Sequence, residues 1–396
     1  MTDPFTPAWP SSTAVPWTDT RPMTERARFV ALHEEGLYST ADLAARFGIS
    51  RKTAYKWLAR HRDGGLDALA DQPSVRHAQH AKTDPDIEAL VVAARRKHPT
   101  WGPRKLLPWI AKRHPAVALP AASTVGAILT RNGLVEPRRR RRVAAHPGAR
   151  PLVADAPGDV WTADYKGQFR TGDGELCYPL TVCDAHSRFV LAVDGHRSVE
   201  QYGALRAFDR LFREHGLPRS IRTDNGTPFA TQAICGLSRL SVWWLKLGIT
   251  PDRIEPGRPQ QNGQHERMHR TLKAETARPP EANVARQQVR FDRWRAEFND
   301  ERPHDALGGE TPASRYVPSP RPMPDALPGP EYPAHVEVRQ VSRCGTFKLK
   351  GHQRFLSQAL AGETIAFEEV ADGVWSLHFY AVKLGRFDER DYQLKT

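Results

Sequence analysis

The sequence predicts a multidomain protein with α-helical helix-turn-helix modules, a central α/β core and a small SH3-like β-barrel at the C-terminus. Three observations predict this fold class. Apolar residues recur at helical spacing through residues 24–134, strand-like runs alternate with helices from residue 159, and short alternating segments broken by glycines fill residues 334–396. At 396 residues the chain is also too long for one ordinary core.

The composition indicates the class of partner. The formal net charge is +13 and the pI is about 9.8, so we expect a polyanionic partner, with nucleic acid as the first candidate. An acidic membrane surface would also suit this charge, but no apolar run approaches the roughly 20 residues of a spanning helix. We therefore predict no membrane partner. The four cysteines are scattered without a Cys-x-x-Cys pair, which favours a reducing compartment and argues against a structural zinc site.

Residues 1–22 are rich in proline, serine and threonine and lack the apolar stretch of a signal peptide, so they are predicted to be a disordered leader. Residues 23–72 then predict three short helices, with Thr24, Ser39 and Ser50 as N-caps. A short helix, a glycine turn and a second, more basic helix form the helix-turn-helix pattern. A generic three-helix bundle is the alternative. The residues expected to face DNA are Arg51, Lys52, Tyr55 and Lys56.

A second helical unit spans residues 83–136 and resembles another helix-turn-helix or a winged helix. Its first helix ends at His98-Pro99, its middle helix is interrupted by Pro108, and Ser123 or Thr124 caps its last helix.

An arginine-rich linker covers residues 137–157. A charge run this dense cannot pack, so we predict a solvated arm that lies along phosphates or in a minor groove. A nuclear-targeting patch is the competing interpretation. The run consists of Arg138, Arg139, Arg140, Arg141 and Arg142.

Residues 158–316 predict an α/β layer. Val160–Tyr165 alternates like a strand, and residues 178–193 read as a hairpin with Asp184 at its turn. Further helices are expected near residues 205–212, 235–247 and 281–299, the last with Val289 in its interior, and a short strand at Ser220–Thr223 leads into Asp224.

The stretch Gly257–Glu275 starts as a loop and becomes a helix after Gly263, with apolar positions at Met268 and Leu272. On that helix Glu266, Arg270 and Lys273 share one face. An exposed Glu–Arg pair at i,i+4 spacing is the simpler interpretation of this face.

Three carboxylates are predicted to meet at the ends of the core strands. Asp164 and Asp224 each end a strand, and Glu266 projects from the helix. They would repel one another unless cations neutralise them, and hard oxygen ligands suit Mg²⁺ or Mn²⁺. Two such ions about 3.5–4 Å apart would activate a water or a 3′-hydroxyl at a phosphodiester. Arg270 and Lys273 would then face the DNA backbone, whereas Asp184 is assigned a structural role in its turn.

Residues 317–333 are proline-rich and predict a linker. In residues 334–396 four strands are expected, at residues 336–341, 346–349, 364–367 and 374–379, which together suggest the small β-barrel.

At this point several motifs resemble one known family. They are similar to the integrase catalytic core shared by DDE transposases of insertion sequences and retroviral integrases, most like the IS481 and IS3 groups. The matches run in order over roughly residues 159 to 316. They are Trp161-x-x-Asp164, Thr223-Asp224-Asn225-Gly226-x-x-Phe229, Gly257-Arg258-Pro259-Gln260-x-Asn262-Gly263-x-x-Glu266-Arg267, Arg270-Thr271-Leu272-Lys273, and Phe298-Asn299-x-x-Arg302-Pro303-His304-x-Ala306-Leu307 with Thr311-Pro312.

The resemblance implies a ribonuclease-H-like core with Asp164, Asp224 and Glu266 as its acidic triad, and Arg258 joins the expected DNA contacts. One departure is the 41 residues between Asp224 and Glu266, a longer gap than in retroviral relatives. We place the added length in the 235–247 helix. The His/Cys zinc unit of retroviral integrases is missing from the sequence.

The resemblance implies a bacterial DNA transposase with two Mg²⁺ or Mn²⁺ ions, in the cytoplasm and associated with the nucleoid. It would bind terminal inverted repeats of its element, cut the element ends and join them to target DNA, as a homodimer or larger homo-oligomer on DNA. Two rivals are a non-catalytic DNA-binding repressor and a ribonuclease-H-type nuclease without strand transfer. The triad and its flanking motifs disfavour the first, and the N- and C-terminal domains disfavour the second.

Overall fold

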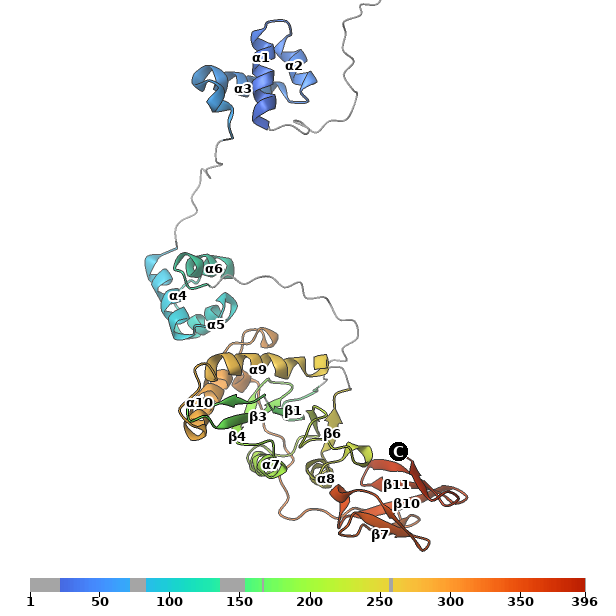
Figure 1. Ribbon diagram of the computed structural model, residues 1–396. Helices are drawn as coiled ribbons and strands as arrows, with labels where there is room; N and C mark the ends of the chain where they lie inside the picture. Colours follow the sequence, from blue (N-terminus) through green and yellow to red (C-terminus); the bar gives the residue numbers. More distant parts are fainter. Residues whose placement is uncertain (1–21, 72–82, 136–153, 166, 256–258, 396) are drawn as a thin grey trace, which may run out of the picture. The chain divides into compact units, whose positions relative to one another are not determined.

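The computed structural model describes residues 22–71, 83–135, 154–165, 167–255 and 259–395. The chain divides into two compact units, residues 1–82 and residues 83–396 (Figure 1). The predicted leader up to residue 21, the five-arginine arm and Arg258 lie outside the described residues. Within the described part, no helix combines the length and the apolar composition that crossing a membrane requires.

The first unit is a helix-turn-helix domain, as predicted. It contains α1 (Pro22–Glu34), α2 (Thr40–Arg46) and α3 (Arg51–Gly64), followed by a 3₁₀ turn, η1 (Leu66–Leu69). The Ser39 side chain accepts a hydrogen bond from the backbone N–H of Asp42, and the Ser50 side chain accepts one from that of Thr53, so both predicted caps are present. The expected cap at Thr24 is wrong, because α1 already begins at Pro22. The helices enclose a small apolar core of Phe29, Val30, Leu43, Ala44, Ala54, Trp57 and Leu69.

The second helical module holds α4 (Pro85–Lys97), α5 (Pro103–Arg113) and α6 (Ala122–Arg131). Pro108 was predicted to interrupt the middle helix, but α5 continues through it. The missing N–H of Pro108 leaves only the carbonyl of Arg104 without its helical partner, and Arg104 is exposed. The N-cap of α6 is Ala121 and makes no side-chain cap, so the caps expected at Ser123 or Thr124 are also wrong. The apolar core of the module is centred on Val91, Trp101, Leu106, Ile110, Val125 and Leu129.

The integrase-like region is built on one mixed sheet. Its strands are β1 (Val160–Tyr165), β2 (Phe169–Arg170), β3 (Leu176–Asp184), β4 (Val190–His196), β5 (Ser220–Thr223) and β6 (Thr250–Arg253). The order is β2-β3-β1-β5-β6, with β4 also paired to β3. β1 runs antiparallel to β3 but parallel to β5, and β5 is parallel to β6. This arrangement confirms the predicted ribonuclease-H-like core.

Helices cover both faces of this sheet (Figure 1). α7 (Gln201–His215) and α8 (Arg239–Lys246) pack on the face that carries Trp161 and Ala163. α9 (Gly263–Thr276), entered through the 3₁₀ turn η3 (Pro259–Asn262), and α10 (Val284–Ala296) cover the opposite face. Side chains of a strand alternate between faces, so Thr162 and Asp164 point toward α9.

Two predicted helices differ from those observed. The helix expected over residues 235–247 starts only at Arg239, after a capping box between Ser238 and Ser241. Ahead of it lies a 3₁₀ turn, η2 (Ile234–Gly236), in which Cys235 has a positive φ of 52°. The helix expected over 281–299 is α10, which continues as a π-helical turn, η4 (Glu297–Glu301). Val289, predicted to be interior, faces solvent.

Two 3₁₀ turns, η5 (Asp305–Leu307) and η6 (Pro312–Ser314), end the core. The proline-rich segment after them follows the core surface. Ser319 N donates to His215 O at 2.9 Å, Leu217 N donates to Arg321 O at 2.7 Å, and the Arg321 guanidinium donates to Leu247 O at 2.8 Å. The segment thus has fixed contacts with the ends of α7 and α8.

The C-terminal region is all-β, as predicted. Its strands are β7 (Glu337–Gln340), β8 (Thr346–Leu349), β9 (His352–Phe355), β10 (Thr364–Ala371), β11 (Val374–Phe379), β12 (Val382–Asp388) and β13 (Gln393–Lys395), with a 3₁₀ turn, η7 (Gln358–Leu360), before β10. They form a five-stranded antiparallel sheet, β13-β12-β11-β10-β7, and a β8-β9 hairpin. The apolar cluster of this domain also includes Val242 and Leu245 of α8. Lys246 pairs with Glu363 at 2.8 Å beside this shared cluster.

Candidate active site

Two aspartates lie at the ends of neighbouring parallel strands: Asp164 is the fifth residue of β1, and Asp224 directly follows β5. In the β1–β5 pair, Val160 is opposite Ser220 and Thr162 is opposite Arg222. If this register continued for two residues, past the end of β5, Asp224 would lie opposite Asp164 on the same face. Neighbouring strands are about 4.8 Å apart, so the two carboxylates would then have a common edge of the sheet.

Hydrogen bonds fix the backbone of the turn after β5, which carries Asp224. Its Oδ1 accepts a hydrogen bond from Gly226 N at 3.1 Å. Asn225 donates from its side-chain amide to Ile254 O at 2.9 Å, which ties the turn to the chain leaving β6. The Asp-Asn-Gly sequence therefore fixes the position of the carboxylate-bearing turn, because Asx side chains readily hydrogen-bond local backbone groups.

α9 has two chemically different faces. Glu266, Arg270 and Lys273 are all exposed, in agreement with the predicted shared face. Met268 and Leu272 are buried, as their spacing predicted. His265 and His269 are buried with them, each 2% exposed, and this was not predicted.

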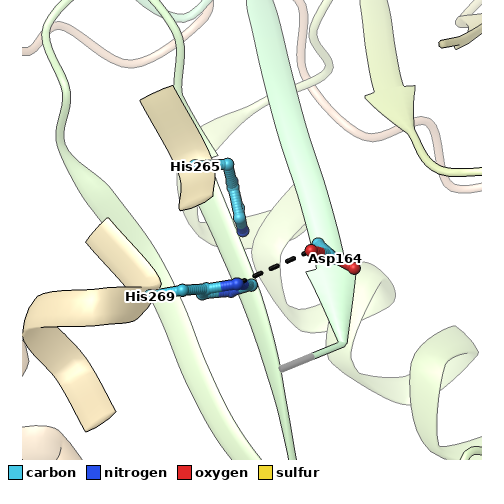
Figure 2. A group of neighbouring side chains, drawn as sticks. All are labelled: Asp164, His265 and His269. Carbon is cyan, nitrogen blue, oxygen red and sulfur yellow. Dashed lines mark ion pairs between the residues drawn. The ribbon is translucent and has the colours of Figure 1, made fainter. Parts of the chain in front are cut away.

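These two histidines lie beside Asp164 (Figure 2) and contact two threonines of the sheet. His269 Nδ1 is 3.5 Å from Asp164 Oδ2. Thr181 Oγ1, on β3, is 2.6 Å from the Nε2 atoms of both His265 and His269. Thr162 Oγ1, on β1, is 2.8 Å from His265 Nδ1. The contacts join the first two turns of α9 to β1 and β3.

Among the described residues, the one group of three or more potential metal ligands with mutual distances within 4.8 Å is Asp164, His265 and His269. Asp224 and Glu266 are not members of that group. The convergence of all three predicted carboxylates therefore stays a prediction. The signal that could have revealed the histidines is their i,i+4 spacing on the same helical face as Met268 and Leu272.

Asp184 has a structural role, as expected. It is 1% exposed and accepts hydrogen bonds from Gly158 N at 2.9 Å, Ser187 N at 2.7 Å and Ser187 Oγ at 2.5 Å. These bonds close the β3–β4 turn and attach the chain entering β1. With all its bonds directed to local structure, this carboxylate is unsuited to holding a metal ion.

A cationic cavity of about 450 Å³ lies between α5, α9 and the turn after β3. Its basic lining residues are Lys105, Arg188, Arg267 and Arg302. Burial, with a smaller effect of Arg302, lowers the pKa of Lys105 to about 8. Burial also lowers the pKa of His304, beside this group, to about 3. The concentration of positive charge favours an anionic ligand.

The predicted DNA-facing residues of the first unit lie on one helix. Arg51, Lys52, Tyr55 and Lys56 are exposed on α3, whereas Trp57 is buried. Arg270 and Lys273 are exposed on α9.

Protein-family models match this chain in domain order. Two models described as "Integrase core domain" match residues 154–259 and 247–312. Together these two models span residues 154–312, which hold the mixed sheet and its helices. Two models described as "Homeodomain-like domain" match residues 21–70 and 53–129, and "IS481 family transposase, C-terminal domain" matches residues 336–395. The predicted resemblance to insertion-sequence transposases with an integrase core is confirmed.

Curated relatives include two insertion-element proteins. The IS407 uncharacterized 31.7 kDa protein of Burkholderia multivorans (strain ATCC 17616 / 249) is 28% identical over 183 residues, which is 46% of this chain and 64% of that protein. The IS476 uncharacterized 39.2 kDa protein of Xanthomonas euvesicatoria is 28% identical over 179 residues, 44% of this chain and 50% of that protein. The match thus spans between half and two thirds of these relatives.

Similar solved structures are retroviral. The simian T-cell lymphotropic virus intasome, in complex with PP2A regulatory subunit B56 gamma, is 16% identical with a TM-score of 0.37, covering 70% of this chain and 97% of that chain. The HTLV-2 integrase catalytic core domain in complex with magnesium is 16% identical with a TM-score of 0.34, covering 42% of this chain and 100% of that chain.

Proposed function

We propose that this protein is a transposase that binds the terminal inverted repeats of an insertion sequence, cuts its ends and joins them to target DNA. The observation that carries the proposal is the parallel pairing of β1 with β5 in the region that matches the integrase core model, which supports a common site for Asp164 in β1 and Asp224 after β5. The proposed setting is the cytoplasm of a bacterium, on its nucleoid. Two element ends must be held together, so we also propose a homodimer or larger homo-oligomer on DNA.

The proposed metal site consists of Asp164, Asp224 and Glu266. The residues fit Mg²⁺ or Mn²⁺ because they offer carboxylate oxygens, the ligands these hard ions prefer, from two adjacent strand ends and one neighbouring helix. Two such ions, when bound, would lower the pKa of the attacking hydroxyl group and offset charge on the leaving oxygen.

The reaction consists of two displacements at phosphorus. In the first, water attacks the phosphodiester at the element end; the bond from phosphorus to the element's 3′ oxygen breaks, and that oxygen leaves as a 3′-hydroxyl. In the second, this hydroxyl attacks a target phosphodiester and displaces the target's own 3′ oxygen. Neither step needs a covalent link to the protein. The protein contributes by holding the attacking and leaving oxygens in line with the phosphorus atom.

The proposed DNA contacts lie on exposed cationic surfaces. Arg270 and Lys273 follow Glu266 by one and two turns along α9, so a backbone that reaches the carboxylates would pass both cations. On α3, Arg51, Lys52, Tyr55 and Lys56 form the proposed groove-reading surface. The arginine arm and Arg258 complete the proposed set.

The test compares wild type with Glu266→Gln on labelled DNA that carries the element end, in Mg²⁺. We expect 3′ nicking and joined products from wild type, and rates lower by at least about 100-fold from the variant, since a lost metal ligand removes several kcal/mol of transition-state stabilisation. Glu214→Gln is the matched control. Glu214 is a half-exposed carboxylate on α7, which covers the opposite sheet face, and its variant is expected to match wild type.

Two results would oppose the proposal. Tight binding of the element end without cleavage in Mg²⁺ or Mn²⁺ would favour the DNA-binding repressor. Equal cleavage by Glu266→Gln and wild type would remove Glu266 from the metal site.

A further inference from the structure

The Asp164–His265–His269 group has the ligand chemistry of a transition-metal site rather than of a magnesium site. Imidazole nitrogen suits Zn²⁺, Co²⁺, Ni²⁺ and Cu²⁺, whereas Mg²⁺ is held by oxygen. The histidines are four residues apart on one face of α9, so both rings reach the same point beside β1 (Figure 2). Their ligand atoms and a carboxylate oxygen of Asp164 lie within 4.8 Å of one another.

The separation of two of the three ligand atoms suits a bound ion. Zinc bonds of about 2.0–2.1 Å in a tetrahedral site separate the ligand atoms by roughly 3.3 Å. The observed separation of His269 Nδ1 and Asp164 Oδ2 is 3.5 Å. An ion between these two atoms would therefore require little movement of either side chain.

The groups around the histidines resemble the outer shell of a metal centre. Thr162 Oγ1 contacts His265 Nδ1 at 2.8 Å, so an ion would take Nε2 of that ring in place of its 2.6 Å contact with Thr181 Oγ1. Thr181 Oγ1 is within 2.6 Å of Nε2 in both rings and donates to Asp164 O at 3.0 Å. One hydroxyl thus marks the point where the two rings converge, and it fixes their orientations.

We infer that Asp164, His265 and His269 form a three-ligand site for a transition-metal ion of the Zn²⁺ class, with a water or the Thr181 hydroxyl as a fourth ligand. The site shares Asp164 with the proposed carboxylate site but takes none of its other ligands. An ion held by the histidines would withdraw Asp164 from the Mg²⁺ or Mn²⁺ ions. Zn²⁺ would then inhibit DNA cleavage, a consequence that rests on the proposed function.

The first test measures metal binding without DNA. Wild type is titrated with Co²⁺, whose visible absorption intensifies when it is four-coordinate with nitrogen ligands, and Zn²⁺ is then added to displace it. We expect one displaceable site in wild type, weakened at least ten-fold in His265→Gln and in His269→Gln. His186→Gln, an exposed histidine outside the group, is the control and should bind as wild type does. Equal binding by all four proteins, or none by wild type, would overturn the site.

Because both histidines are buried, thermal melting accompanies each titration. If neither variant folds, the zinc-edge X-ray absorption spectrum of Zn²⁺-loaded wild type decides instead. A first shell with two imidazole ligands supports the site, and a shell of oxygen alone contradicts it.

The second test measures inhibition. The Zn²⁺ concentration that halves Mg²⁺-supported cleavage is expected to rise at least ten-fold in His265→Gln, each protein being compared with its own zinc-free rate. Unchanged inhibition would refute competition through Asp164. If wild type does not cleave DNA at all, the proposed function fails, while the Co²⁺ titration still decides the metal site.

Discussion

At the scale of single residues, two aspartates of one sheet have opposite surroundings. Asp184 is fully enclosed and accepts three hydrogen bonds from its own turn and from Gly158. Asp164 keeps 20% of its side chain exposed and faces the histidines of α9. The Asp184 carboxylate is thus used in local hydrogen bonds, whereas the Asp164 carboxylate is accessible to a ligand.

The Asp184→Ala variant tests the structural role. Removing the carboxylate leaves the N–H groups of Gly158 and Ser187 buried without an acceptor, so we expect the free energy of unfolding to fall by about 3 kcal/mol. Urea denaturation measures the change. Asp325→Ala, at an exposed position, is the control and should stay within about 0.5 kcal/mol of wild type. Equal stability of the two variants would contradict this account.

His304 predicts a pH dependence of stability. Burial, reinforced by Lys105 and Arg302, lowers its pKa to about 3, whereas an unfolded histidine titrates near 6.5. Between these values the unfolded chain binds a proton that the folded chain does not, so stability falls as the pH falls. His304→Gln should lose about 2 kcal/mol less than wild type between pH 7 and pH 4.5. Urea denaturation at both pH values checks this, and parallel losses in the two proteins would refute it.

At the scale of elements, α8 joins two cores. Leu240 and Trp244 pack in the cluster around the central sheet, whereas Val242 and Leu245 pack with the C-terminal β-domain. The helix is only eight residues long, and its first turn is fixed by the reciprocal bonds of Ser238 and Ser241. Such a short helix depends on its cap and on tertiary packing.

Ser238→Ala is therefore expected to destabilise the protein by about 1 kcal/mol, within a usual range of about 0.5–2 kcal/mol for N-caps. Hydrogen exchange should localise the effect, with faster exchange in α8 and in the β-strands that contact it. Ser314→Ala, at an exposed residue of a distant 3₁₀ turn, serves as the comparison. Faster exchange confined to α8 would show that the β-domain does not depend on this helix.

The elements that the sequence predicted well are those with a clear period. Ser220–Thr223 and Val374–Phe379 were predicted at their observed bounds. β9 was missed because three of its four residues, His352, Gln353 and Arg354, are polar, and β12 because Gly385 lies within it. The spacing of His265 and His269 could have revealed their burial, but their contacts with Thr162 and Thr181 of distant strands could not be predicted. Strand ends identified Asp164 and Asp224, but their relation to Glu266 depends on a long connection without a period.

At the scale of the whole molecule, charge determines the expected behaviour with DNA. The net charge of +13 includes exposed cations on α3 and α9. Cations that neutralise phosphates release counterions, so binding should weaken steeply as salt rises. Tyr55, 61% exposed on α3, belongs to the proposed groove-reading surface, and a contact of its ring with DNA would not be screened by salt in this way.

Salt dependence separates cations that contact phosphates from those that pair within the protein. We expect the logarithm of the DNA association constant to fall linearly with the logarithm of salt concentration, with a slope smaller by about one in Lys52→Ala and in Arg270→Ala. Arg213→Ala is the control, because Arg213 lies on α7 and pairs with Asp209 at 3.0 Å, and its slope should match that of wild type. Fluorescence anisotropy at several salt concentrations gives all four slopes. If the slope falls equally in all three variants, total charge alone governs binding; if it falls only in Lys52→Ala, DNA is held by the helix-turn-helix unit and does not reach the Glu266 face of α9.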